Sequence, residues 1–191
     1  MDWQRSKIYR QIIGVICISF VLPAFSNISN NISDQYKDRF NKLAMDLWDY
    51  AELGYQEHKS IEAISNELKK DGFKISFNVA NIPTAFIAEY GNKGPVIAIL
   101  GEYDALPGLA QTKNSFRDIE PNKTGAGHAC GHHLFGAGSA WAAVIIKDWL
   151  DENNIDGRIR YYGTPAEEGG SGKVYMVREG LFDDVDIVLH W

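Results

Sequence analysis

Apolar residues recur at intervals of three and four over residues 33–54, as they do on the buried side of an α-helix. The positions are Phe40, Leu43, Ala44, Leu47 and Ala51. Gly54 is predicted to stop this helix. A second helix is predicted with Ile61, Ile64 and Leu68 on its apolar side. It should end at Gly72, because glycine adopts a left-handed cap at little cost.

After Gly72 the pattern changes to short runs rich in β-branched and aromatic residues. These runs predict strands over 73–77, 84–89 and 96–100. The run 96–100 is apolar throughout, as expected for a strand that is covered on both faces. A long polar stretch with several glycines, 102–131, follows it.

A third helix is predicted over about 133–150, where the sequence is apolar nearly all round, so this helix should be buried. A strand over 159–162, a helix after Gly172 and a last strand over 185–189 complete the pattern. Strands that alternate with helices in this way predict an α/β sandwich.

The beginning of the chain has a different pattern. Arg5, Lys7 and Arg10 precede the apolar run 12–25, and small residues follow at a cleavage spacing. This order predicts a signal peptide, and therefore a secreted or periplasmic protein without stable membrane association after cleavage. An uncleaved membrane anchor is the alternative, although the run is shorter than the ~20 residues of a spanning helix. The expected division is a signal peptide over 1–26, a linker with the start of the first helix over 27–39, and a globular domain over 40–191.

Composition and charge narrow the class of partner. The chain of 191 residues is 45% hydrophobic and carries a formal net charge of -6, with acidic and basic residues mixed along its length. No basic stripe is present to follow a phosphate backbone, so we expect no nucleic-acid partner. Removal of residues 1–26 would leave Cys130 as the only cysteine, which excludes an internal disulfide.

The first segment with candidate functional residues is 101–108, Gly-Glu-Tyr-Asp-Ala-Leu-Pro-Gly, directly after the apolar strand 96–100. Successive residues of an extended chain point to opposite sides, so Glu102 and Asp104 share one side. Two such carboxylates suit a metal site, and they also suit a solvated turn.

The second segment is 127–133, Gly-His-Ala-Cys-Gly-His-His. Cys130 and His132 can present a sulfur and an imidazole nitrogen to one cation, and the helix that starts here favours the thiolate form. A structural cysteine beside helix-capping histidines is one alternative. A thiol-dependent hydrolase is another, with Cys130 as the nucleophile and His132 or His128 as the base.

The third segment is 164–172, Thr-Pro-Ala-Glu-Glu-Gly-Gly-Ser-Gly. Adjacent glutamates point in different directions, so one of Glu167 and Glu168 can hold a metal while the other takes a proton from water. Surface charge is the simpler explanation for an isolated Glu-Glu pair.

Taken in this order, the three segments resemble the co-catalytic metallopeptidase and amidohydrolase family, peptidase family 20. It includes aminoacylase, carboxypeptidases and indole-acetyl-amino-acid hydrolases. The most similar branch is that of aminobenzoyl-glutamate hydrolase and the aminoacylase-like dipeptidases, and the resemblance covers residues 40–191. It implies a three-layer α/β sandwich with a mixed central sheet, here without the lid and dimerisation domain.

The resemblance also implies roles for individual residues. Glu167 would be the general base and Asp104 the aspartate that orients the site, while the metal ligands would be Cys130, His132 and Glu168. Three further candidates for metal binding are Glu102, His133 and His190. Glu102 stands where relatives with a His-x-Asp motif have a ligand, and His133 where Asp or Asn is common. His190 lies near the strand end where the similar branch has a metal-binding histidine.

The implied reaction is hydrolysis of an amide bond in an N-acyl amino acid, an aminobenzoyl-glutamate-like compound or a dipeptide. It would use two divalent metal ions, with zinc as the first choice and manganese as the second. A non-catalytic metal-binding relative with the same fold is the alternative. The whole protein is expected to be a homodimer, and this N-terminal part is expected to be inactive alone.

Overall fold

The computed structural model describes residues 34–119 and 125–190. The predicted signal peptide over 1–26 lies outside these ranges. Residues 38–191 form one compact unit, which contains the sheet and the predicted site residues. No helix within the described ranges has the length and apolar character that crossing a bilayer requires.

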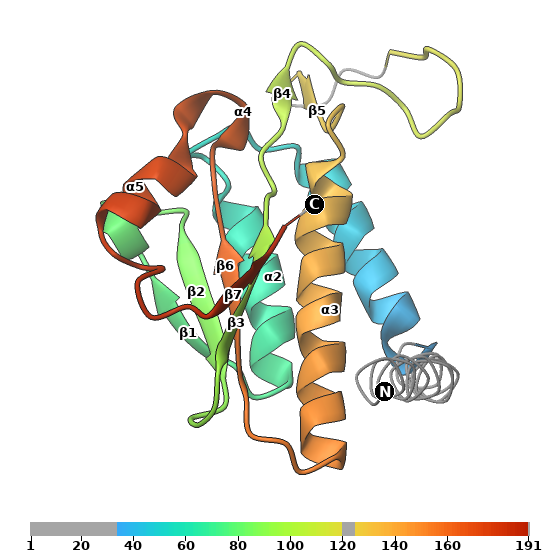
Figure 1. Ribbon diagram of the computed structural model, residues 1–191. Helices are drawn as coiled ribbons and strands as arrows, with labels where there is room; N and C mark the ends of the chain where they lie inside the picture. Colours follow the sequence, from blue (N-terminus) through green and yellow to red (C-terminus); the bar gives the residue numbers. More distant parts are fainter. Residues whose placement is uncertain (1–33, 120–124, 191) are drawn as a thin grey trace, which may run out of the picture. The chain divides into compact units, whose positions relative to one another are not determined.

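A mixed five-stranded sheet forms the centre of this unit, as predicted (Figure 1). Its strand order is β1-β2-β6-β3-β7. The strands are β1 (Lys74–Phe77), β2 (Phe86–Tyr90), β3 (Val96–Gly101), β6 (Arg158–Gly163) and β7 (Ile187–Leu189). The pairs β1 with β2 and β2 with β6 are antiparallel, whereas β3 runs parallel to both β6 and β7. The carboxyl ends of β3, β6 and β7 therefore lie at one edge.

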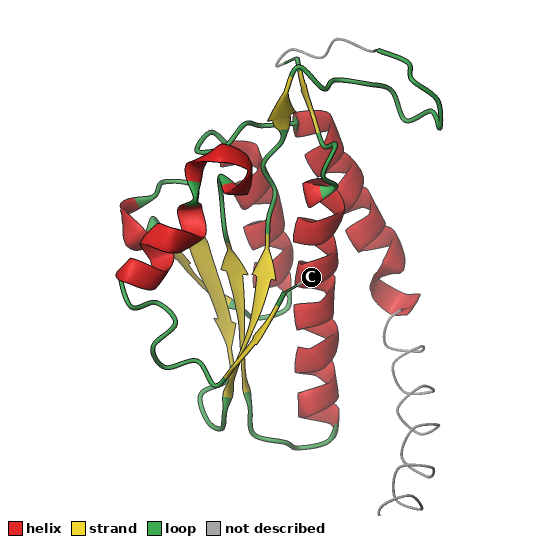
Figure 2. Ribbon diagram, turned by 45° about the horizontal axis from the view of Figure 1, so that its top comes forward, coloured by secondary structure: helices red, strands yellow, loops and turns green. Residues whose placement is uncertain are grey.

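Three helices of this unit cover one face of the sheet: a helix that ends at residue 50, α2 (His58–Lys70) and α3 (His132–Glu152) (Figure 2). Tyr161 of β6 points to this side, where its hydroxyl donates to the carbonyl of Gly136 on α3 at 3.3 Å. The prediction that α3 is buried was wrong in part, because Leu134 is 56% exposed.

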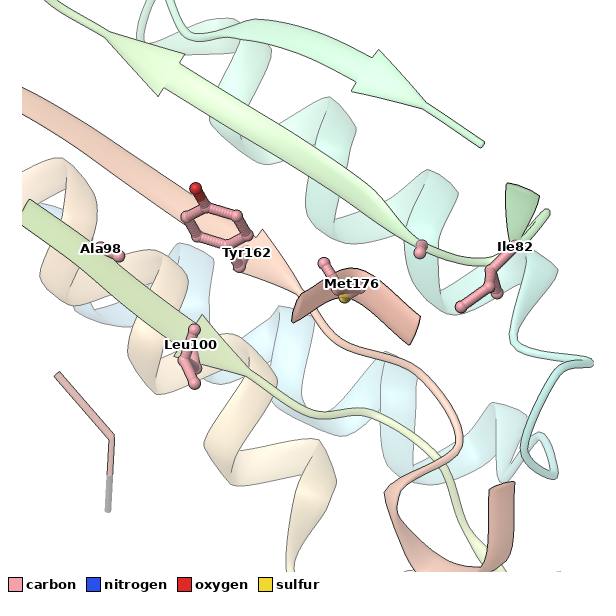
Figure 3. Close-up of a cluster of buried hydrophobic side chains, with 6 residues drawn as sticks. Ile82, Ala98, Leu100, Tyr162 and Met176 are labelled. Atoms are coloured by element: carbon pink, nitrogen blue, oxygen red, sulfur yellow. The ribbon is translucent and has the colours of Figure 1, made fainter. Parts of the chain in front are cut away.

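Short elements cover the opposite face and make the third layer. They are η1 (Val79–Asn81) and α5 (Gly172–Arg178) (Figure 1). The next residue of β6, Tyr162, points to this side because side chains alternate along a strand. It belongs to a buried apolar cluster with Met176 of α5 (Figure 3). The cluster consists of Ile82, Ala85, Ala98, Leu100, Tyr162 and Met176.

Most predicted elements are present with shifted ends. The first helix ends at residue 50, before Gly54, and Ala51 already has a positive φ of 40°. The predicted strand over 84–89 is β2 (Phe86–Tyr90), and the last strand is limited to β7 (Ile187–Leu189). Gly72 has a φ of 84°, as expected of the residue that closes α2.

The polar stretch after β3 is held against the start of α3 by a small second sheet. β4 (Leu106–Pro107) pairs antiparallel with β5 (Ala126–Gly127). The end of β6 is joined to that of β3, since the N–H and the hydroxyl of Thr164 both donate to the carbonyl of Gly101 at 2.9 and 3.1 Å. All three predicted segments therefore meet at one edge of the sheet.

Candidate metal centre

His132, the first residue of α3, is the centre of the site. Its Nε2 lies 2.8 Å from Oε2 of Glu102, and its Nδ1 lies 2.9 Å from Oδ1 of Asp104. The loop after β3 thus provides one carboxylate to each ring nitrogen. The sequence predicted that Glu102 and Asp104 share one side, and in the fold both reach the same imidazole.

The Glu-Glu segment approaches the same ring from the end of β6. An oxygen of Glu167 lies 3.8 Å from Nε2 of His132, and an oxygen of Glu168 lies 4.0 Å from Nδ1. The backbone N–H of Glu168 donates to Oδ2 of Asp104 at 2.9 Å. Asp104 therefore links the helix start to the Glu-Glu segment.

Four carboxylates surround the imidazole of His132 and change the pKa values in the site. Burial alone would lower the pKa of His132, but hydrogen bonds to Asp104 and Glu102 outweigh it and raise the pKa to about 10. Burial alone would raise the pKa of Glu102, but hydrogen bonds from His132 and Lys173 outweigh it and lower the pKa to about 2. The carboxylates of the site thus favour a positive charge at the position of His132.

One set of atoms has the spacing of a metal site. Ligand atoms of Glu102, His132 and Glu167 all lie within 4.8 Å of one another. Glu102 and His132 are buried, whereas the side chain of Glu167 is 45% exposed. The geometry therefore places Glu102, one of the further candidates from the sequence, in the same group as His132 and Glu167.

Cys130 and Glu168 lie together on another side of the site. A hydrogen bond with the Glu168 carboxylate is the main cause that raises the pKa of the exposed Cys130 thiol to about 11. Oε1 of Glu168 is buried and has no hydrogen-bond partner among the described residues. A buried carboxylate oxygen beside a thiol is a donor pair that a divalent cation would satisfy.

The other two candidate histidines differ in position. Nε2 of His190 lies 3.2 Å from Oε1 of Glu102, so this side chain borders the group. His133 points away from it. Its ring contacts Trp48 edge-on at 4.9 Å and lies 5.1 Å from the ring of His128, and burial followed by the charge of His128 lowers its pKa to about 4. The structure does not bring His133 to the other candidates.

Two residues of this region were not selected from the sequence. Lys173 of α5 pairs with Oε1 of Glu102, opposite the oxygen that meets His132. Glu57 is buried and accepts a hydrogen bond from the backbone N–H of Ala166 at 2.8 Å. Lys173 directly follows the third segment, 164–172, which is a signal that the sequence offers. Glu57 offers no comparable signal, because an acidic residue before a helix is ordinarily a cap.

The residues present fit divalent cations. The set combines one imidazole, several carboxylates and one thiol, which are the donor types that zinc uses. Nδ1 of His132 meets a carboxylate while Nε2 faces the group, which is the usual arrangement of a metal-binding histidine. Oε1 of Glu168, which is buried and accepts no hydrogen bond from the described residues, is the acceptor in this structure that a cation would best satisfy.

Comparison with known proteins agrees with this chemistry. The family model described as Peptidase family M20/M25/M40 matches residues 98–191. One of the subunits of p-aminobenzoyl-glutamate hydrolase from Escherichia coli is 46% identical over 155 residues, which cover 81% of this chain and 32% of that protein. The Xaa-Arg dipeptidase of Mus musculus is 30% identical over 167 residues, with 81% and 35% covered. The chain thus spans about a third of the length of these relatives.

A solved structure shows the same fold. It is that of a Bacillus subtilis protein described as a dinuclear metal binding peptidase from the M20 family. The TM-score is 0.68 at 28% identity, and the match covers 81% of this chain and 42% of that one. Residues 98–191 of this chain thus match a domain of Peptidase family M20/M25/M40, and the fold is that of a dinuclear metal binding peptidase of the M20 family.

Proposed function

We propose that the protein containing this chain hydrolyses an amide bond in an N-acyl amino acid, an aminobenzoyl-glutamate-like compound or a dipeptide, with divalent metal ions as cofactors. The convergence of Glu102, Asp104, Glu167 and Glu168 on His132 carries this proposal. The names of the two curated relatives, one from an aminobenzoyl-glutamate hydrolase and the other a dipeptidase, support the substrate class.

Two ions would be held by the residues on either side of His132. Nε2 of His132 and the carboxylate of Glu102 would serve one side, and Cys130 with Glu168 the other. Divalent cations, when bound, polarise the scissile carbonyl and lower the pKa of water. Zinc is our first choice because the set contains a thiol and an imidazole, and manganese is the second because carboxylates predominate.

Glu167 is the proposed general base. Its neighbour Glu168 is tied to Asp104 through its backbone N–H, whereas the carboxylate of Glu167 is partly exposed and can reach solvent and substrate. A base in this position takes a proton from the attacking water and delivers it to the leaving amine. Asp104 holds the imidazole of His132 in one orientation, so its proposed role is to orient this histidine.

Export and dimerisation belong to the same proposal. The order of charged, apolar and small residues over 1–26 supports a signal peptide and a secreted or periplasmic enzyme. N-terminal sequencing of the mature protein should find a start near Asn27, and retention of Met1 on a cytoplasmic product would contradict export. Sedimentation of the whole protein would test the proposed homodimer.

The activity itself is tested by metal removal and return. The whole protein, freed of metal with a chelator, should lose hydrolysis of p-aminobenzoyl-glutamate and of N-acetyl amino acids. Addition of zinc or manganese should restore it, with two ions bound per chain by mass spectrometry of the native protein. Unchanged turnover in protein shown to contain no metal would refute the proposal.

A further inference from the structure

Glu57 stands immediately before α2, in the position of a capping residue, but its side chain forms no hydrogen bond with that helix. Glu52 does so in its place. The two oxygens of Glu52 accept from the N–H groups of Lys59 and Ser60 at 3.0 and 2.9 Å, and from the hydroxyl of Ser60 at 2.8 Å. The N–H groups of Lys59 and Ser60 are therefore satisfied without the side chain of Glu57.

The carboxylate of Glu57 instead crosses to the Glu-Glu segment. The residue is 0% exposed, and its Oε1 accepts the N–H of Ala166 at 2.8 Å. Ala166 has a left-handed backbone, with φ 55° and ψ 42°, immediately before α4 (Glu167–Gly170). A residue with a Cβ adopts this conformation only where its surroundings enforce it.

The neighbours of Glu57 hold the same short segment. A Cβ on Gly54 would lie 2.9 Å from Cα of Ala166, so the two backbones touch. The hydroxyl of Tyr55 donates to the carbonyl of Gly170, at the other end of α4. Residues 54–57 thus contact both ends of the turn that presents Glu167.

We propose that Glu57 is a positioning residue, which fixes the backbone of Ala166 so that Glu167 points to its place in the site. This rests on the proposed function, in which Glu167 is the base. Glu57 anchors the N–H before Glu167, and Asp104 anchors the N–H after it. With both flanking amides held, the carboxylate of Glu167 has one backbone from which to reach the substrate.

The hydrogen-bond acceptor is tested separately from the charge and the volume of Glu57. In the whole zinc-loaded protein, Glu57→Leu removes the acceptor and Glu57→Gln keeps an oxygen in its place. We expect Glu57→Leu to lower kcat for p-aminobenzoyl-glutamate on the order of 10²-fold, as small displacements of a catalytic group do, with KM and zinc content unchanged. Glu57→Gln should remain close to the wild type. Glu62→Leu, on an exposed position of α2, is the matched control.

The route through Ala166 is tested by a double variant. Glycine adopts a left-handed backbone without strain, so Ala166→Gly should recover a large part of the kcat that Glu57→Leu loses. Glu57→Met, whose flexible side chain fills a similar space, replaces the leucine variant if that one does not fold. Equal loss in Glu57→Gln and Glu57→Leu, or no recovery in the double variant, would overturn the proposal.

A second measurement separates this inference from the proposed function. Exchange of the Ala166 amide hydrogen should be slow in the wild type and in Glu57→Gln, and at least tenfold faster in Glu57→Leu, because only the leucine variant leaves this N–H without its acceptor. An inactive wild type with this exchange pattern would refute the hydrolase and leave the anchoring of Ala166 intact. Equal exchange in all three proteins would refute the anchoring, whatever the activity.

Discussion

Oδ1 of Asp104 lies 2.9 Å from Nδ1 of His132, and this contact directs the other ring nitrogen, Nε2, toward Glu102 and Glu167. The second oxygen of Asp104 accepts the N–H of Glu168. One buried carboxylate thus sets the orientation of an imidazole from α3 and of a backbone from the end of β6. Loss of the Asp104 carboxylate should therefore disturb two parts of the site, the imidazole of His132 and the backbone of Glu168.

Asp104→Asn should weaken metal binding by about 10- to 100-fold, the usual cost of losing the carboxylate that orients a metal-binding histidine. The amide has one acceptor oxygen for two donors, so either His132 or Glu168 loses its partner. Calorimetric titration of the metal-free protein with zinc measures the change. Asp156→Asn, at an exposed position, should bind zinc as the wild type does. An unchanged zinc affinity in Asp104→Asn would show that the ring is held by other contacts.

Glu167→Gln should retain bound metal and lower turnover on the order of 10² to 10⁴-fold, because the amide has nearly the same shape but cannot take the proton. The structure makes metal content a necessary second measurement, since Glu167 lies within 4.8 Å of Glu102 and His132. Loss of metal together with activity would make Glu167 a ligand and place the base elsewhere. Glu179→Gln, on an exposed position after α5, serves as the control.

The fold could be predicted from the sequence because its signals are local. The apolar run that forms β3 and the periodic positions of α2 depend on neighbours a few residues away. The ends of elements were less predictable. Ala51 leaves the helix three residues before Gly54, and no local signal there competes with the glycine.

The site was predictable to the extent that its residues lie in motifs at strand ends. His132, Asp104 and Glu168 meet because β3 and β6 run parallel and end at one edge. Glu57 could not be found in this way, since its partner Ala166 is far away in sequence and donates through its backbone, which no residue type reveals. The contact between Glu102 and His132 could not be found in this way either, because the two residues are far apart in sequence and only the fold brings them together.

Cys130 of the metal-free protein should react slowly with iodoacetamide at pH 8. The Glu168 carboxylate raises the pKa of the thiol to about 11, so little of the reactive thiolate is present. Glu168→Gln should speed the reaction severalfold. Peptide mapping by mass spectrometry assigns the label to Cys130 and distinguishes it from Cys17. Rapid labelling in the wild type would instead favour the thiol-dependent hydrolase, whose nucleophile must be ionised.

Glu57 should make the free energy of unfolding depend on pH. Burial raises the pKa of its carboxyl from the ordinary 4.5 to about 7. The folded state therefore binds this proton more tightly than the unfolded state does. The resulting stabilisation is complete below pH 4.5 and is lost as the pH rises to about 7, a change on the order of 3 kcal/mol.

Glu57→Gln removes this titration while keeping an acceptor for Ala166. The variant should therefore gain stability relative to the wild type between pH 4.5 and 7, and the difference should stay constant above pH 8. Urea unfolding of both proteins, in chelator and at closely spaced pH values, measures it. The raised pKa of His132 also makes stability depend on pH. Its stabilisation is complete below pH 6.5 and is lost progressively as the pH rises to about 10, but this dependence occurs in both proteins and cancels in the difference. A difference that does not change with pH would mean that Glu57 is already ionised at pH 5 in the folded protein.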